Sequence, residues 1–257
     1  MPISPAKSRI FRRTLFVLVL VASFILITAA TFRLQSYLFA RKVHSVLNRM
    51  ETIELDKTSQ AEVVALLPEF KPGTQSDFLI NAEPNARCPG EACYALHIEN
   101  WTRGIIAWLQ SKIGYRYHWL HEAVYWVGHR FLLFAAYVEI RGGRVSRYEY
   151  TLWVENQEFP ASDIVVVHAL GTDRASFPGY FGFMSDYDEI GDFRIRVARN
   201  KPTTSMYIAF TPGAKPEDVR NTYDVHLNCV WNAQGCSATK QLLALLWETK
   251  MEPKNQK

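Results

Sequence analysis

The sequence of 257 residues lacks the short motifs that mark nucleotide, phosphate and serine-hydrolase sites. It contains no Gly-x-Ser-x-Gly elbow, no phosphate-binding glycine loop and no dinucleotide fingerprint. It also shows no internal repeat and no regular alternation of strands and helices of the kind that builds a parallel sheet. No catalytic residue can therefore be assigned from a motif, and neither a cofactor nor a bound metal is expected.

Net charge is missing from most of the chain. Residues 1–32 hold four of the 29 Lys and Arg side chains and no acidic one, which leaves 25 basic and 25 acidic side chains in residues 33–257. A nucleic-acid-binding domain needs an excess of basic side chains on one face. The composition offers no such excess, so no nucleic-acid partner is expected.

A long apolar run, residues 14–32, follows a basic lead at residues 1–13. A helix over this run is roughly 28 Å long, close to the thickness of the bilayer's hydrocarbon layer. Its length favours an uncleaved transmembrane anchor over a signal peptide cleaved near Thr28 to Ala30, which is the alternative. The lipid bilayer is the expected partner of residues 14–32, and the basic lead slightly favours a cytoplasmic N-terminus.

Cysteine is scarce, and its four residues form two close pairs, Cys88 with Cys93 and Cys229 with Cys236. An even number of cysteines outside the cytoplasm indicates disulfides, for which three connectivities exist. Glycine in both short segments favours pairing within each segment. The alternatives are one zinc ion on four thiolates, which the spacing fits poorly, and free thiols in a cytosolic domain.

The remaining chain predicts one domain behind the anchor. We expect a helical stalk over residues 33–54, an extracytoplasmic domain over residues 55–250 and a polar tail at residues 251–257. A capping box at Ser59 and Glu62 predicts a short helix at the domain's entrance. Strands are expected at residues 94–98, 131–140, 145–155, 164–170, 192–199 and 206–210, and further helices at Pro216 and Ser237. The order of elements predicts an α+β fold with a mainly antiparallel sheet and flanking helices.

The strongest strand signal is a hairpin at Gly142–Gly143, because these residues supply the positive φ of a tight turn. Its second arm alternates strictly. Tyr148, Tyr150, Leu152 and Val154 point to one side, and Arg147, Glu149, Thr151 and Trp153 to the other. This pattern is typical of a sheet with one covered face.

Four of the seven tryptophans lie between residues 101 and 126, at Trp101, Trp108, Trp119 and Trp126. Their spacing is compatible with two helices whose aromatic faces cover the sheet, and this interpretation is favoured. A membrane-surface helix is the alternative, although Lys112 falls on the aromatic line rather than opposite it. These tryptophans form the candidate contact surface for a protein partner in the envelope.

Other patterns resemble ligand sites only in part. His121-Glu122 begins like a zinc-protease helix, but Tyr125 stands where the second histidine is needed. The acidic segment from Asp186 to Asp192 resembles a calcium loop whose fifth and twelfth places hold Ile190 and Val197. Ordinary histidines and a solvated acidic turn explain these patterns better. A solvated strand face likewise explains the arginines Arg194, Arg196 and Arg199.

One resemblance covers most of residues 55–247. It is carried by loose motifs: Gly128-His-Arg-Phe131 through Gly143-Arg-Val145, Leu227-Asn-Cys229, Gly235-Cys236, and a leucine-rich end closing on Trp247. In these the chain resembles uncharacterised single-anchor, bitopic envelope proteins of soil bacteria. The resemblance implies a topology and carries no established activity.

The sequence thus predicts a membrane-anchored binding or assembly module outside the cytoplasm. The alternative is an anchored envelope hydrolase whose site is assembled from residues far apart in the sequence. Convergence of His118, His121 or His168 with Asp186 or Asp188 in one pocket would favour that alternative.

Overall fold

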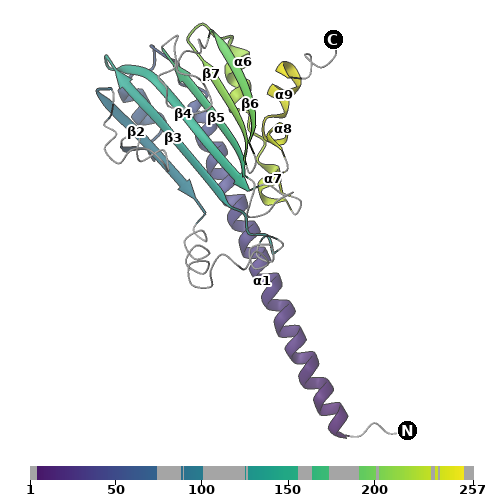
Figure 1. The fold of residues 1–257 in the computed structure, drawn as a ribbon. Coiled ribbons are helices and arrows are strands. Elements are labelled where there is room, and N and C mark those ends of the chain that lie inside the picture. The colour runs from purple at the N-terminus through teal and green to yellow at the C-terminus, as the bar shows by residue number, and fades with distance from the viewer. Residues whose placement is uncertain are drawn as a thin grey trace.

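The computed structural model describes residues 5–73, 88, 90–100, 125, 127–155, 164–173, 191–200, 203–232, 235–236 and 238–251. It combines a long N-terminal helix with a mixed sheet of seven strands and shorter helices, in agreement with the predicted α+β class. Figure 1 shows the helix leaving one end of the domain and extending well beyond it.

Helix α1 (Pro5–Met50) is continuous over 46 residues. Its apolar side chains from Leu15 to Ile27 are exposed, and it is long and apolar enough to cross a membrane. Toward the C-terminal end of the helix the apolar side chains are buried instead of exposed. The main core contains Phe39, Val43, Val46, Leu47 and Met50. Beyond Phe39 the predicted stalk is therefore a core helix of the domain.

The strands are β1 (Lys71–Pro72), β2 (Ala92–Glu99), β3 (Leu132–Arg141), β4 (Arg144–Glu155), β5 (Ile164–Thr172), β6 (Phe193–Asn200) and β7 (Thr203–Phe210). Their order in the sheet is β1-β2-β3-β4-β5-β7-β6. The six long strands occur where the sequence predicts them. The hairpin between β3 and β4 turns at Gly142 and Gly143, with φ of +58° and +71°, as expected.

The sheet is mainly antiparallel, as predicted, and one pairing, β5 with β7, is parallel. The chain leaves β5 and re-enters the sheet at its outer edge as β6. The antiparallel β6–β7 pair then places β7 between β6 and β5. Strand β6 therefore runs antiparallel to β5, and β7, which turns back beside β6, is parallel to β5. Strand patterns along the sequence do not record which strand becomes the edge.

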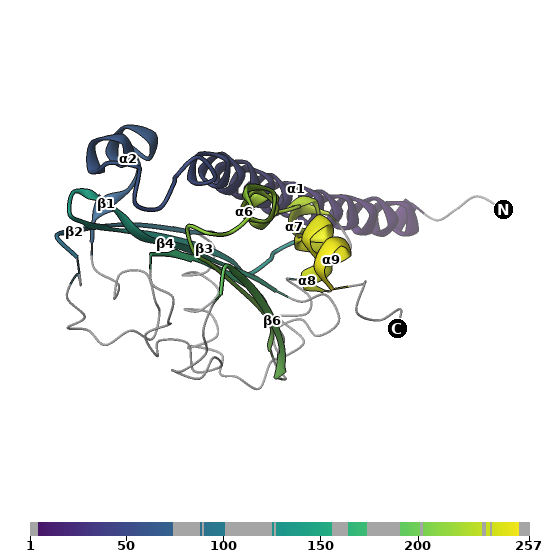
Figure 2. The ribbon, with the colours of Figure 1, turned by 90° about the horizontal axis from the view of Figure 1, so that it is seen from above.

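Short helices complete the side of the sheet that carries α1. They are α2 (Gln60–Leu66), α6 (Pro216–Tyr223), α7 (Asn228–Trp231), α8 (Thr239–Leu242) and α9 (Ala244–Lys250). Helices α1, α2, α6 and α7 lie on one face of the sheet (Figure 2). The predicted capping box is present at Ser59 and Glu62, and α6 begins at Pro216 as expected. The single helix predicted from Ser237 is instead divided at Leu243 into α8 and α9.

Candidate functional site

The polar face of the sheet lies opposite the face that packs against the helices. Strand β4 presents Arg147, Glu149 and Thr151 to this face, while Tyr148 and Tyr150 belong to the main core. The predicted alternation is therefore present. All three polar side chains are nevertheless buried, so both faces of the sheet centre are covered. The sequence pattern predicted only one covered face, because charged alternate residues are typical of a solvated one.

Strand register gathers polar groups from three strands. Tyr137 on β3 is opposite Glu149, and His168 on β5 is opposite Thr151. We call Tyr137, Arg147, Glu149, Thr151 and His168 the polar-face cluster. Directly opposed residues in a sheet have Cβ atoms about 4.5–5.5 Å apart, so the register alone brings these side chains into contact range.

Glu149 is the centre of the cluster. Its Oε2 accepts a hydrogen bond of 2.7 Å from Arg147 Nη2, and its exposed fraction is 0%. Burial by itself lowers the pKa of the Arg147 guanidinium, but the Glu149 carboxylate, with Tyr137 and Glu139 adding to it, outweighs burial and raises the pKa. The two side chains therefore form a buried, charge-assisted pair.

His168 connects Thr151 to the same carboxylate. Thr151 Oγ1 and His168 Nδ1 share a hydrogen bond of 2.6 Å, and His168 Nε2 lies 3.7 Å from Glu149 Oε2. Burial, reinforced by the nearby Arg147, lowers the pKa of His168 to about 3. Near neutral pH the imidazole is therefore uncharged, and its 3.7 Å approach to Glu149 is not an ion pair.

A hydroxyl, an imidazole and a carboxylate in a row are the groups of a nucleophilic triad. In a triad the carboxylate supports a protonated imidazole, whereas here Glu149 is bound to Arg147 and His168 stays neutral. A base with a pKa near 3 takes a proton from a hydroxyl poorly at neutral pH. The cluster is better suited to holding a polar group by hydrogen bonds than to transferring protons.

Neutral His168 makes the stability of the fold depend on pH. The unfolded histidine titrates near 6.5, so between pH 6.5 and about 3 the unfolded chain binds one proton more than the folded chain. The free energy of unfolding should then fall by up to about 1.4 kcal/mol for each unit that the pH drops through this window. His168→Asn should remove this part of the acid dependence in urea unfolding at pH 4.5 and 7. The exposed His44→Asn is the control, and equal profiles for wild type and His168→Asn would contradict the buried neutral state.

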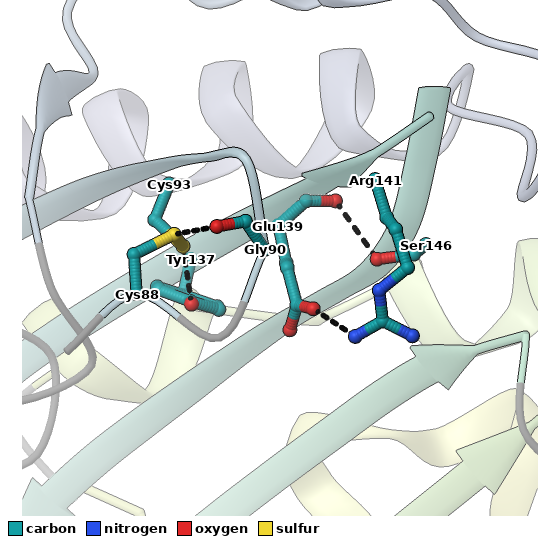
Figure 3. The surroundings of a disulfide bond; sticks show 7 residues. All are labelled: Cys88, Gly90, Cys93, Tyr137, Glu139, Arg141 and Ser146. Atoms are coloured by element: carbon teal, nitrogen blue, oxygen red, sulfur yellow. Dashed lines mark hydrogen bonds and ion pairs between the residues drawn. A yellow bond between two sulfur atoms is a disulfide. The ribbon is translucent and has the colours of Figure 1, made fainter. Parts of the chain in front are cut away.

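A disulfide borders the cluster on β2 and β3. Cys88 and Cys93 are bonded, as are Cys229 and Cys236, so the structure has the two local pairings. Figure 3 shows Tyr137 pointing at the first bridge, with its hydroxyl 2.8 Å from Cys93 Sγ. The phenol donates this bond, because a disulfide sulfur carries no hydrogen. Burial, with Glu139 and Glu149 adding to it, raises the pKa of Tyr137 well above its usual range.

A second acidic side chain on β3 is paired near the same bridge. Glu139 Oε1 accepts a hydrogen bond of 2.6 Å from Arg141 Nη2, and Ser146 Oγ donates to the Glu139 carbonyl (Figure 3). The disulfide loop lies close against this strand, since a Cβ on Gly90 would lie 2.3 Å from the Ile140 carbonyl oxygen. The bridge therefore fixes the loop beside the charged end of β3.

The domain also contacts α1 at the end of the apolar run. The rings of Phe32 and His129 meet edge to face at 5.3 Å. Arg130 is buried, with its guanidinium 3.6 Å from the centre of the Tyr125 ring. Burial lowers the pKa of Arg130, and Arg33 adds to the shift. The segment around residues 125–131 thus joins the helix where the apolar run ends.

Gly128 is the close-packed position of this contact. Its φ is +106°, and an added Cβ would lie 3.4 Å from Arg33 Cγ. Gly128→Ala should lower the free energy of unfolding by about 1–3 kcal/mol, because its φ of +106° is a conformation that a residue with a side chain rarely adopts. Gly143→Ala is the matched control, since it shares the positive φ but has open space around it. The losses in urea unfolding should be similar for the two variants, and no loss in Gly128→Ala would contradict a strained backbone at this position.

Two grooves lie on the helical side of the domain. The larger, with a cavity volume of about 460 Å³, lies between residues 51–57 and residues 210–220. The smaller has a volume of about 330 Å³ and separates α1 from the segment that leads into α7. We call the second the juxtamembrane groove. Neither groove reaches the polar-face cluster.

The predicted site residues fall into two groups. Trp101, Trp108, Trp119 and Trp126 lie outside the described residues, as do His118, His121, Asp186 and Asp188. His168 is described, and it lies beside Thr151 and Glu149. Arg194 and Arg196 lie on the edge strand β6. Within the part of the chain that the structure describes, no group of three or more His, Cys, Asp or Glu side chains is placed to hold a metal ion.

Sequence reasoning missed Arg147, Glu149 and Thr151 as members of a site. The two-glycine turn alone would place Tyr137 opposite Tyr148, but an irregularity between Glu139 and Ile140 shifts the β3–β4 register by one residue and places Tyr137 opposite Glu149. The sequence pattern of the hairpin does not reveal this shift. The partner strand β5 follows a longer connection, and for that reason the sequence does not show that His168 is opposite Thr151.

Comparison of this chain with protein-family models, with curated proteins and with solved structures finds no match. The resemblance to bitopic envelope proteins stays a prediction.

Proposed function

We propose that this chain is a single-pass membrane protein that holds its α+β domain outside the cytoplasm as a binding or assembly module. The observation that carries the proposal is the continuity of α1. One helix presents exposed apolar side chains from Leu15 to Ile27 and then supplies core residues from Phe39 to Met50. The domain is thereby held at a fixed height and orientation relative to its anchor.

Such an attachment favours a module that meets partners in or near the membrane. An enzyme that acts on soluble substrates gains little from a fixed orientation, whereas an assembly contact depends on it. The flanks of the tryptophan-rich segment support a membrane-proximal contact surface. The Asn100 side-chain amide donates a hydrogen bond to the carbonyl of Arg130, and the Arg130 guanidinium donates one to the carbonyl of Tyr125. Both lie beside the Phe32–His129 contact. A second envelope protein is the partner we propose.

The topology part of the proposal rests on the basic lead and on the two disulfides, which persist in oxidising compartments. It is tested with single reporter cysteines in the full-length protein, Ser8→Cys in the lead and Glu248→Cys on α9. A membrane-impermeant maleimide should label Glu248→Cys in intact spheroplasts and Ser8→Cys only after permeabilisation. The reverse order would place the domain in the cytoplasm and refute the proposal.

The assembly part is tested by crosslinking in the native membrane. Mild amine crosslinking before detergent extraction should give a discrete larger species that contains this chain and one other envelope protein. Recovery of the monomer alone, at native expression and over a range of crosslinker lengths, would remove the support for an assembly module.

An anchored hydrolase is the second candidate, favoured by the 2.6 Å contact between Thr151 and His168 beside Glu149. If it is correct, the full-length protein hydrolyses model esters or amides. Thr151→Ser should then retain that activity, and the isosteric Thr151→Val should lose it. The low pKa of His168 argues for the opposite result, with no hydrolysis by any of the three proteins.

A further inference from the structure

The juxtamembrane groove lies where the domain faces the bilayer. On one side it is lined by Tyr37, Arg41 and His44 of α1, and on the other by Asp224, His226 and Trp231. The second side is positioned by α7, which packs against α1 (Figure 1). In the segment before α7, exposed Asp224 and His226 alternate with buried Val225 and Leu227, so both polar side chains face outward while the apolar ones join the core.

The height of the groove follows from the helix geometry. Tyr37 is five residues beyond Phe32, so it lies roughly 7.5 Å above the end of the apolar run. The headgroup layer on each side of a bilayer is roughly 5–8 Å thick. With the anchor in place, Tyr37 at the mouth of the groove therefore lies among the phospholipid headgroups, and Arg41, roughly 6 Å farther along the helix, is within reach of their phosphates through its long side chain.

Exposed side chains at this height continue the apolar surface of the anchor. Leu34, Tyr37 and Leu38 of α1 are 58%, 41% and 53% exposed. Trp231 is 41% exposed, and its ring meets Tyr37 edge to face at 5.9 Å. Amphipathic aromatic rings are enriched at the level of the headgroups. This patch is continuous with the anchor, so lipid rather than a soluble partner covers it.

The charges of the groove select a class of headgroup. Arg41 offers a guanidinium that suits a phosphate, and Asp224 offers a carboxylate that suits an ammonium group. His226 Nε2 lies 3.6 Å from Asp224 Oδ2, and both side chains are about half exposed. The rings of Tyr37 and Trp231 add π faces that attract a cation. A purely anionic headgroup would meet the Asp224 carboxylate, whereas a zwitterionic one satisfies both charges.

We propose that the juxtamembrane groove binds the headgroup of a zwitterionic aminophospholipid, phosphatidylethanolamine in chemical type, with the phosphate at Arg41 and the ammonium at Asp224. The proposal rests on the membrane anchoring proposed above. A primary ammonium donates hydrogen bonds to a carboxylate and a quaternary one cannot, so the ethanolamine head is preferred over choline.

The test uses the full-length protein in vesicles of equal parts phosphatidylethanolamine, phosphatidylglycerol and phosphatidylcholine. Native mass spectrometry after gentle extraction should show retained lipid dominated by phosphatidylethanolamine. Arg41→Gln and Asp224→Asn should each reduce that retention by about fivefold, the size expected from losing one charged contact at a partly exposed site. Arg41→Lys should retain part of it.

Lys42→Gln is the matched control, because Lys42 is exposed on the same helix, carries the same charge and does not line the groove. Equal retention of all three lipids by the wild type, dominance of phosphatidylglycerol, or an equal loss in Lys42→Gln would each overturn the headgroup site. Alkaline extraction and Glu248→Cys labelling of the same samples separate the two proposals. A correctly inserted protein without lipid preference refutes the groove alone, and a protein that leaves the membrane at high pH refutes both.

Discussion

Replacing Glu149 by Gln should destabilise the domain by about 3–5 kcal/mol, because the Arg147 guanidinium would stay buried without its counter-charge. The Arg147 side chain is only 10% exposed, and Glu149 is not exposed at all. An amide of the same size keeps the packing and removes the charge, so the loss reports the electrostatics of the pair. Urea unfolding of the full-length protein in detergent, followed by circular dichroism, measures it.

Glu139→Gln is the matched control for this prediction. Glu139 lies on the same face and is also buried, but its partner Arg141 is 38% exposed and can turn toward water when the charge is lost. Its substitution should cost less than that of Glu149, about 1–2 kcal/mol, because only one member of the pair is buried. Similar losses for Glu139→Gln and Glu149→Gln would contradict the view that burial of the arginine dominates.

The double substitution Arg147→Met with Glu149→Leu separates a stabilising role from a binding role. Apolar replacements of a buried ion pair are often neutral or stabilising by about 1–4 kcal/mol. If the double variant unfolds at or above the wild-type denaturant concentration, the charges do not serve stability. Its loss of partner crosslinking would then assign them to recognition.

The alternation of residues in the sequence predicts the strands, but it does not predict which tertiary contacts cover them. The alternation of β4 places Tyr148 and Tyr150 with the helices and Arg147 and Glu149 on the opposite face, as expected. Burial of that opposite face depends on tertiary contacts. The alternation of side chains along the strand carries no information about such contacts. The same limit applies to β5 and β7, whose parallel pairing follows from the path of the chain between them.

The predicted stalk shows a second property that the sequence pattern does not reveal, namely which apolar residues face the core. Apolar residues at helical spacing from residue 33 to residue 50 predict a helix, and α1 has it. These apolar residues lie on two different faces of the helix. Leu34 and Leu38 are exposed, whereas Val43, Val46 and Leu47 are buried. An apolar side chain facing lipid and one facing a core look alike in sequence, so the end of the anchor and the start of the domain cannot be separated by composition.

Removal of α1 should abolish folding of the domain. A fragment beginning at Glu51 lacks six buried apolar side chains of the main core: Phe39, Ala40, Val43, Val46, Leu47 and Met50. The larger ones contribute about 1.5–3 kcal/mol each. Their total is comparable to the 5–15 kcal/mol by which a typical domain is stable. A fragment beginning at Arg33 keeps this helix and should fold, with both disulfides formed when it is secreted.

Near-ultraviolet circular dichroism and a cooperative urea transition measure the folding of both fragments, and mass spectrometry under non-reducing conditions reports the disulfides. Within the longer fragment, Leu47→Ala should cost about 2–5 kcal/mol, and the exposed Leu38→Ala should have little effect. A cooperative transition in the fragment from Glu51 would mean that the domain folds without its anchor helix. The anchor would then be a tether, and the fixed orientation on which the proposed assembly role depends would be lost.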